Sequence, residues 1–245
     1  MTVLDVFRQY VEHLFAGKRC EARQVIFAAQ DRGVTASSLL ASVVWPAMEQ
    51  VTRLYRQHRI SRVVEHMATR INRMIADQLN GFLAREPRTG KRIVVGCGDG
   101  EMEELGAQML ADLFEAKGWT VWFVGSGVPD DEVLQLIGRL SPDVLCFHGT
   151  QPSAVPKMRG LIELIRRVGV CPDMQVLVTG GVFSRAEGLA DEIHADLFAP
   201  DAASALRTVE EHPIRIPKPD VPEPGRRRKR RRRRLSARRR VAVPC

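Results

Sequence analysis

The sequence has few of the residues that mark metal-binding or disulfide-bonded proteins. Its five cysteines are odd in number and widely spaced, and no CxxC pair or Cys/His cluster occurs. This spacing excludes a zinc-finger type of site and argues against a disulfide framework. We therefore expect free thiols in a reducing compartment, which favours a cytoplasmic protein.

Long apolar runs are also missing. The first fifteen residues, MTVLDVFRQYVEHLF, carry charges throughout, which is not typical of a secretory signal. No stretch approaches the roughly 20 apolar residues that a membrane-spanning helix needs. We expect no membrane association.

Basic residues are concentrated in one region. Between Arg226 and Arg240 there are 12 basic residues and no acidic one, whereas residues 1–225 hold more Asp and Glu than Lys and Arg. Five prolines lie between His212 and Pro224. We predict that residues 212–245 form a Pro-rich linker and a disordered Arg-rich tail. Such a tail either contacts nucleic acid or another polyanion non-specifically through 226–240 or is a solvated segment without a partner.

The first 86 residues are predicted to form a four-helix bundle. Apolar residues recur at helical spacing in four segments that turn signals separate. Gly33 follows the second segment, Pro46 interrupts the third, and Ser61 can cap the fourth. The expected helices cover about 3–14, 19–31, 37–55 and 62–75.

From residue 90 to residue 211, short β-branched runs alternate with helical stretches. The runs are RIVVGC, TVWFVG, DVLCFH, QVLVTG and DLFA. Alternation with continuously apolar strands indicates a parallel sheet that helices cover on both faces. We predict an α/β fold in which the helical bundle precedes a doubly wound, flavodoxin-like, five-stranded parallel sheet. A ligand of such a Rossmann-like domain binds beyond the carboxyl ends of the strands.

Small and polar residues follow the predicted strands. They form the turns GCGDGEMEELG, GSGVP (with Gly125, Ser126 and Gly127), HGTQPS and TGGVF. Glycines at such turns let a ligand approach the backbone closely. A dinucleotide is disfavoured, because Glu101 interrupts the G-x-G-x-x-G pattern and no acidic residue closes the second strand to bind a ribose.

These turns resemble those of the cobalamin-binding modules in corrinoid methyl-carrier proteins and light-sensing cobalamin regulators. In that family an acid-x-His-x-x-Gly turn supplies a histidine to the lower face of cobalt. A Ser-x-Leu about forty residues later and a Gly-Gly pair line a slot for the detached dimethylbenzimidazole base. Here Glu101–Gly106 matches the first motif, except that Glu103 replaces the histidine. His148-Gly149-Thr150 lies at the position of the Ser-x-Leu motif, and Gly180-Gly181 matches the glycine pair.

The bundle carries a matching feature. The family caps the upper face of the corrin with a tryptophan that nine intervening residues separate from a Glu-His pair. Nine residues likewise separate Tyr55 from Glu65 and His66 in this sequence. The resemblance therefore implies a cap made of Tyr55, Glu65 and His66, and it covers about residues 1–210.

The resemblance implies cobalamin as the cofactor, in a weakened form of binding. A carboxylate is a poorer ligand than imidazole for a nitrogen-preferring cobalt centre. We therefore expect no metal ligand from the protein. Three outcomes remain open: weak binding of cobalamin with its benzimidazole still on cobalt, binding of another flat or nucleoside-bearing ligand, or no ligand. Replacing Glu103 by histidine is expected to restore binding with the base detached.

Three functions follow from these expectations. The first is a sensory or regulatory cobalamin-binding protein without catalytic residues, which couples ligand occupancy to a protein partner, to another copy of itself or to nucleic acid. The alternatives are a corrinoid methyl carrier that serves a separate methyltransferase, and a ligand-free scaffold that keeps the fold.

Plainer explanations exist for the individual residues. Glu103 suits the first turn of a helix because its charge interacts favourably with the helix dipole. Tyr55 lies on an apolar helical face and can simply pack in the core. Glu65 and His66 can be solvated, and His148 can form a hydrogen bond at a strand end.

Overall fold

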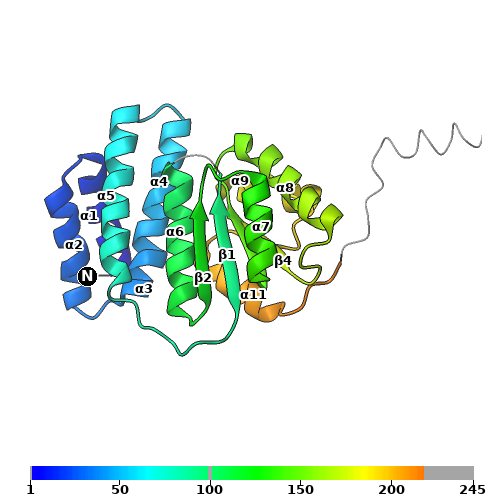
Figure 1. The fold of residues 1–245 in the computed structure, drawn as a ribbon. Coiled ribbons are helices and arrows are strands. Elements are labelled where there is room, and N and C mark those ends of the chain that lie inside the picture. The colour runs from blue at the N-terminus through cyan, green and yellow to red at the C-terminus, as the bar shows by residue number, and fades with distance from the viewer. Residues whose placement is uncertain (1, 99–100, 218–245) are drawn as a thin grey trace, which may run out of the picture. The chain divides into compact units, whose positions relative to one another are not determined.

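The computed structural model describes residues 2–98 and 101–217, and it describes their side chains except at residues 101–103 (Figure 1). Within this part of the chain, no helix is long and apolar enough to cross a membrane. The described residues also include no cluster of three or more His, Cys, Asp or Glu side chains that could hold a metal ion. The predicted tail segment 226–240 lies outside the described residues.

The N-terminal part is helical, as the apolar spacing predicts. Thr2 caps the first helix through its side chain, which accepts a hydrogen bond from the backbone N–H of Asp5. Ser61 caps the last helix in the same way, through the N–H of Val64. The segments are α1 (Val3–Phe15), α2 (Arg19–Asp31), α3 (Ala36–Leu39), η1 (Leu40–Val44), α4 (Trp45–Arg56) and α5 (Arg62–Asn80).

The third predicted helix is continuous but contains one wide turn. In η1 the chain forms a π-helical turn, in which the N–H of Trp45 bonds to the carbonyl of Leu40, five residues earlier. Pro46 follows directly and has no N–H to donate to the preceding turn. The wide turn accommodates the proline ring without breaking the helix, and α4 continues from it.

The second half forms one five-stranded parallel sheet with the order β2-β1-β3-β4-β5. This confirms the predicted doubly wound, flavodoxin-like arrangement. The central strands β3 and β4 are buried along their whole length, which explains their continuous apolar runs. The strands are β1 (Arg92–Cys97), β2 (Thr120–Gly125), β3 (Val144–His148), β4 (Gln175–Thr179) and β5 (Leu197–Ala199).

Helices cover both faces of this sheet. Between β4 and β5 the chain forms two short helices, and Gly188, with a positive φ of 79°, lies between them. The helical segments of this half are α6 (Glu101–Ala116), α7 (Asp130–Leu140), η2 (Pro152–Ala154), α8 (Val155–Val168), α9 (Gly181–Arg185), α10 (Leu189–Glu192) and α11 (Ala202–Glu211).

The helical N-terminal part packs directly on one face of the sheet domain. One hydrophobic cluster joins Leu14 and Ile75 of the bundle to Leu105 of α6 and Val95 of β1. In Figure 1, α6 lies between the N-terminal helices and the strands, and α7 and α8 lie beyond the strands. The two halves share this core, and the division into domains 1–86 and 90–211 stays a prediction.

A buried carboxyl group lies where α5 meets α6. Asp112 accepts a hydrogen bond from Asn80 on one oxygen at 2.9 Å, and its other oxygen has no partner among the described residues. Burial, followed by the negative charges of Asp77 and Glu115, raises the pKa of Asp112 from 3.8 to about 7. The folded state therefore holds a proton that the unfolded state releases between pH 4 and pH 7, so stability falls as the pH rises through this window.

Replacing Asp112 by asparagine is expected to stabilise the fold above neutral pH. The variant carries no charge to bury, so its free energy of unfolding at pH 8 should exceed that of the parent by about 1–3 kcal/mol. Urea unfolding at pH 5 and pH 8 measures the difference, which should shrink at the lower pH. The exposed Asp173→Asn is the control and should show no such pH dependence. A gain at pH 8 no larger than that of the control would contradict this assignment.

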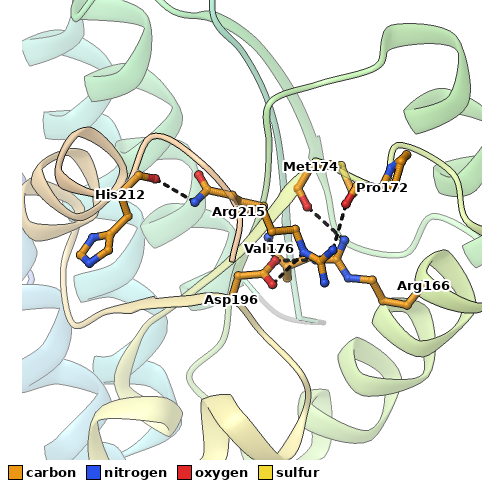
Figure 2. Close-up of polar contacts among 8 residues, drawn as sticks. Arg166, Pro172, Met174, Val176, Asp196, His212 and Arg215 are labelled. Atoms are coloured by element: carbon orange, nitrogen blue, oxygen red, sulfur yellow. Dashed lines mark hydrogen bonds and ion pairs between the residues drawn. The ribbon is translucent and has the colours of Figure 1, made fainter. Parts of the chain in front are cut away.

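A largely buried cluster of ion pairs around Asp196 attaches the C-terminal end of the sheet domain to β4 (Figure 2). Asp196 accepts hydrogen bonds from Arg166, from Arg215 at 2.9 Å and from the N–H of Val176 at 2.7 Å. Arg215 also donates to the carbonyl of Pro172 at 2.9 Å. Residues 212–215, which the sequence assigns to the linker, are therefore attached to the sheet domain.

Candidate functional site

The carboxyl ends of three strands lie side by side. In the register of the sheet, Cys97 of β1 pairs with His148 of β3, and His148 pairs with Thr179 of β4. Nδ1 of His148 lies 3.0 Å from Oγ1 of Thr179. The N–H groups of Gly98 and Gly149 donate to the carbonyls of His148 and Thr179. These bonds hold the three strand ends together. In a doubly wound sheet, a ligand binds beyond the carboxyl ends of the strands.

The imidazole of His148 is enclosed on three sides. Only 1% of the residue is exposed, and its ring meets the ring of Trp45 edge-on with 5.5 Å between centroids. A Cβ at Gly106 would lie 2.2 Å from Nε2, and a Cβ at Gly180 would lie 2.9 Å from Cε1. Nε2 has no hydrogen-bond partner among the described residues. Burial lowers the pKa of His148 to about 4, so the ring is neutral near pH 7.

The glycine pair after β4 is required by the backbone. Gly180 has φ 99° and ψ 168°, a conformation that is essentially restricted to glycine. A Cβ there would also lie 2.4 Å from the carbonyl oxygen of Gly149. Arg185 closes this turn from outside, since its Nη2 donates to the carbonyl of Thr150 at 2.7 Å.

A cleft of about 460 Å³ lies between α4 and these strand ends. Trp45 and Met48 form an apolar part of its wall, while Arg53, Arg56 and Arg185 place three guanidinium groups along it. Glu49 is the carboxylate among the described lining residues, and burial raises its pKa. The lining residues are Trp45, Met48, Glu49, Thr52, Arg53, Arg56, Gln57, His148, Thr150, Gly180, Gly181, Ser184 and Arg185.

The structure thus brings together one part of the predicted site. His148, Thr150, Gly180 and Gly181 line the cleft, and Gly149 adjoins them. Gly106 lies behind His148, where its lack of a side chain makes room for the imidazole. The side chains of Glu101 and Glu103 lie outside the described residues, so their predicted roles stay predictions.

The glycines after β2 lie elsewhere. Gly125 and Gly127 line a second, smaller cavity of about 110 Å³ together with residues of α7 and α8, which pack on the opposite face of the sheet. Ser126 donates through its hydroxyl to Glu104 at 2.8 Å, and Glu104 pairs with Arg73 of α5 at 3.5 Å. This contact ties the turn after β2 to the helical cap.

The predicted cap residues are not among the described residues that line the cleft. Glu65 is 7% exposed and accepts a hydrogen bond from Thr69 at 3.4 Å, while His66 lies 3.4 Å from Glu65 and 3.3 Å from Arg62. Tyr55 is half-buried at the end of α4. The helical wall of the cleft is instead built by another face of α4, from Trp45 to Arg56, and by Gln57 after it.

Sequence reasoning missed nine of the thirteen described lining residues, among them Trp45, Arg53, Arg56 and Arg185. A signal for the first three exists, because positions 45, 48, 49, 52, 53 and 56 share one face of a helix. On that face, an aromatic residue and a methionine are followed by two arginines. Arg185 has no such signal in the sequence, because only the folding of α9, which begins at Gly181, brings it to the cleft.

Two protein-family models match this chain. Both are described as a B12 binding domain; one covers residues 91–210 and the other covers residues 6–80. The two matches together span most of the chain and coincide with the sheet domain and the helical cap.

Corrinoid proteins are among the similar sequences and structures. Dimethylamine corrinoid protein 2 of Methanosarcina acetivorans is 22% identical over 202 residues, which are 76% of this chain and 91% of that protein. Dimethylamine corrinoid protein 1 of the same organism is 24% identical over 119 residues, but the match spans only 49% of this chain and 55% of that protein. The solved monomethylamine corrinoid protein of Methanosarcina barkeri has a TM-score of 0.77 at 14% identity, covering 86% of this chain and 99% of that one. This last likeness concerns the fold.

Proposed function

Because the chain belongs to the family of B12-binding domains, we propose that it is a corrinoid carrier protein that presents its cofactor to a separate methyltransferase. The observation that carries this proposal is the cleft between α4 and the strand ends, in a chain whose cap and sheet both match the family. The relatives support the carrier, which is one of the alternatives predicted from the sequence, better than they support the sensor.

The cleft offers apolar contact and positive charge to a ligand. Trp45 and Met48 offer apolar contact, and Gly180 and Gly181 add no side chain to the wall. A corrinoid, when bound, supplies a cobalt centre that accepts and releases methyl groups. The protein's own part is to hold the ring, to exclude water from one side of it and to leave the other side to a partner. The three arginines give the cleft a positive charge that favours a ligand with an anionic group.

The sensory function is less well supported. The described relatives are named corrinoid proteins, and nothing in their names indicates regulation. A contact with nucleic acid depends on residues 226–240, and the comparisons give it no support. A protein partner fits the carrier proposal, because a carrier without catalytic residues needs a separate enzyme.

The carrier proposal predicts stoichiometric cofactor loading. Full-length protein incubated with hydroxocobalamin should keep about one cobalt per chain through gel filtration, as its visible spectrum and cobalt analysis measure. After reduction and exposure to ¹⁴C-methyl iodide, the loaded protein should carry one labelled methyl group per cobalt and lose it to a thiol when a partner methyltransferase is added. Absence of bound chromophore at millimolar hydroxocobalamin would contradict the proposal and leave the scaffold.

A further inference from the structure

One aromatic side chain occupies the space between Gly180, the first glycine of the pair that the cobalamin-binding resemblance assigns to the base slot, and Gly106, the last residue of the turn that it assigns to the cobalt ligand. We define this slot by Gly106, Gly180 and Thr179, which surround the imidazole of His148. The clash distances of 2.2 Å and 2.9 Å show that neither glycine can carry a Cβ while the ring is present. The space is therefore matched to a planar ring, and His148 already supplies one.

The ring is held in place from several directions. Nδ1 pairs with the hydroxyl of Thr179 at 3.0 Å, Trp45 packs against the ring edge-on, and only 1% of the residue is exposed. The ring is neutral near pH 7, so no charge drives it toward solvent. Withdrawing it would leave a cavity lined by Gly106 and Gly180 and would break the pair with Thr179. Such a change is unfavourable without a compensating ligand.

We propose that His148 permanently occupies the slot that would receive a detached lower base, so that this chain binds corrinoids by the ring alone and leaves their base outside. This inference rests on the proposed corrinoid binding and specifies its ligand class. A dimethylbenzimidazole and the imidazole cannot share the slot. The cleft therefore accepts cobalamin with its base on cobalt and accepts the tail-less cobinamide about equally well.

The proposal changes the expectation for Glu103. From the sequence alone, Glu103→His should restore binding with the base detached. With His148 in the slot, that single variant cannot take up the base. The base detaches only when His148→Ser empties the slot as well, so the two substitutions should act together and not additively.

Affinity for two probes tests the proposal. Hydroxocobalamin and aquocobinamide are titrated by absorption into the parent, His148→Ser, His148→Phe and the double variant Glu103→His/His148→Ser. The parent and His148→Phe, which refills the slot with a ring, should bind both probes within about threefold of each other. The double variant should prefer hydroxocobalamin at least about tenfold. A parent that prefers hydroxocobalamin tenfold, or a double variant without preference, overturns the proposal.

The nitrogen below cobalt gives an independent readout. Protein labelled with ¹⁵N is loaded with unlabelled cob(II)alamin, and its EPR spectrum is recorded. A triplet splitting from the ¹⁴N of the base is expected in the parent, whereas the double variant should show a doublet from a protein ¹⁵N. A doublet or an unsplit signal in the parent would show that the base has detached from cobalt. That result would overturn this inference and leave the proposed function standing. Failure of every variant to bind either probe would instead overturn the proposed function and this inference with it.

Discussion

Replacing Asp196 by alanine is expected to lower the free energy of unfolding by about 3–5 kcal/mol. The side chain of Asp196 is 5% exposed and holds Arg166, Arg215 and the N–H of Val176. Its removal leaves two largely buried guanidinium groups without their counter-charge, and it removes one of the contacts that attach residues 212–215 to the sheet domain. A buried charge without a counter-charge lowers the free energy of unfolding by more than the loss of one favourable contact does.

Denaturant unfolding of the parent and of Asp196→Ala measures this change. The matched control is Glu163→Ala, which removes an exposed ion pair with Arg159 on α8 and should cost no more than about 0.5 kcal/mol. Asp196→Asn should fall between the two, because an amide oxygen still accepts one hydrogen bond. A loss below 1 kcal/mol for Asp196→Ala would mean that the arginines find other partners.

The cluster around Asp196 also shows what the sequence could not predict. Its members lie at positions 166, 196 and 215, and nothing in the local pattern pairs them. The fold, by contrast, was predictable because buried parallel strands produce continuous apolar runs and amphipathic helices produce a regular spacing. The π turn before Pro46 and the break at Gly188 were not anticipated, since each is a local response of the backbone to a single residue.

The site was partly predictable for a related reason. Turn residues such as Gly180 and Thr150 follow strands whose ends must meet in a parallel sheet, so their neighbourhood follows from the topology. The positions of the cap residues depend on how α4 and α5 are rotated against the sheet, and the apolar spacing does not fix those rotations. Trp45 therefore stands over His148, while Tyr55, Glu65 and His66 are not among the described lining residues.

The occupation of the base slot was beyond any pattern in the sequence. His148 could be placed at a strand end, but only the folded structure shows its ring between Gly106 and Gly180. A serine at the same position would leave that space open. One side chain thus decides whether the two retained glycines accommodate a ligand or a residue of the protein itself.

Replacing Gly180 by alanine is expected to destabilise the fold by about 2–4 kcal/mol and to abolish corrinoid binding in the cleft. At φ 99° and ψ 168° an alanine is strained by about 1–3 kcal/mol. Its Cβ would in addition lie 2.4 Å from the carbonyl oxygen of Gly149 and press on the ring of His148. The ends of β3 and β4 must therefore separate, which deforms the wall of the cleft.

The neighbouring glycine provides the matched control for this prediction. Gly181 does not have a positive φ, and a Cβ there would meet only the flexible end of Arg185, at 2.5 Å from Nη1. Gly181→Ala should therefore cost less than about 1 kcal/mol, because Arg185 can move aside. Urea unfolding and hydroxocobalamin titration of both variants measure the contrast. Equal losses of stability in the two variants would show that general crowding of the turn, and not the backbone conformation of Gly180, determines its shape.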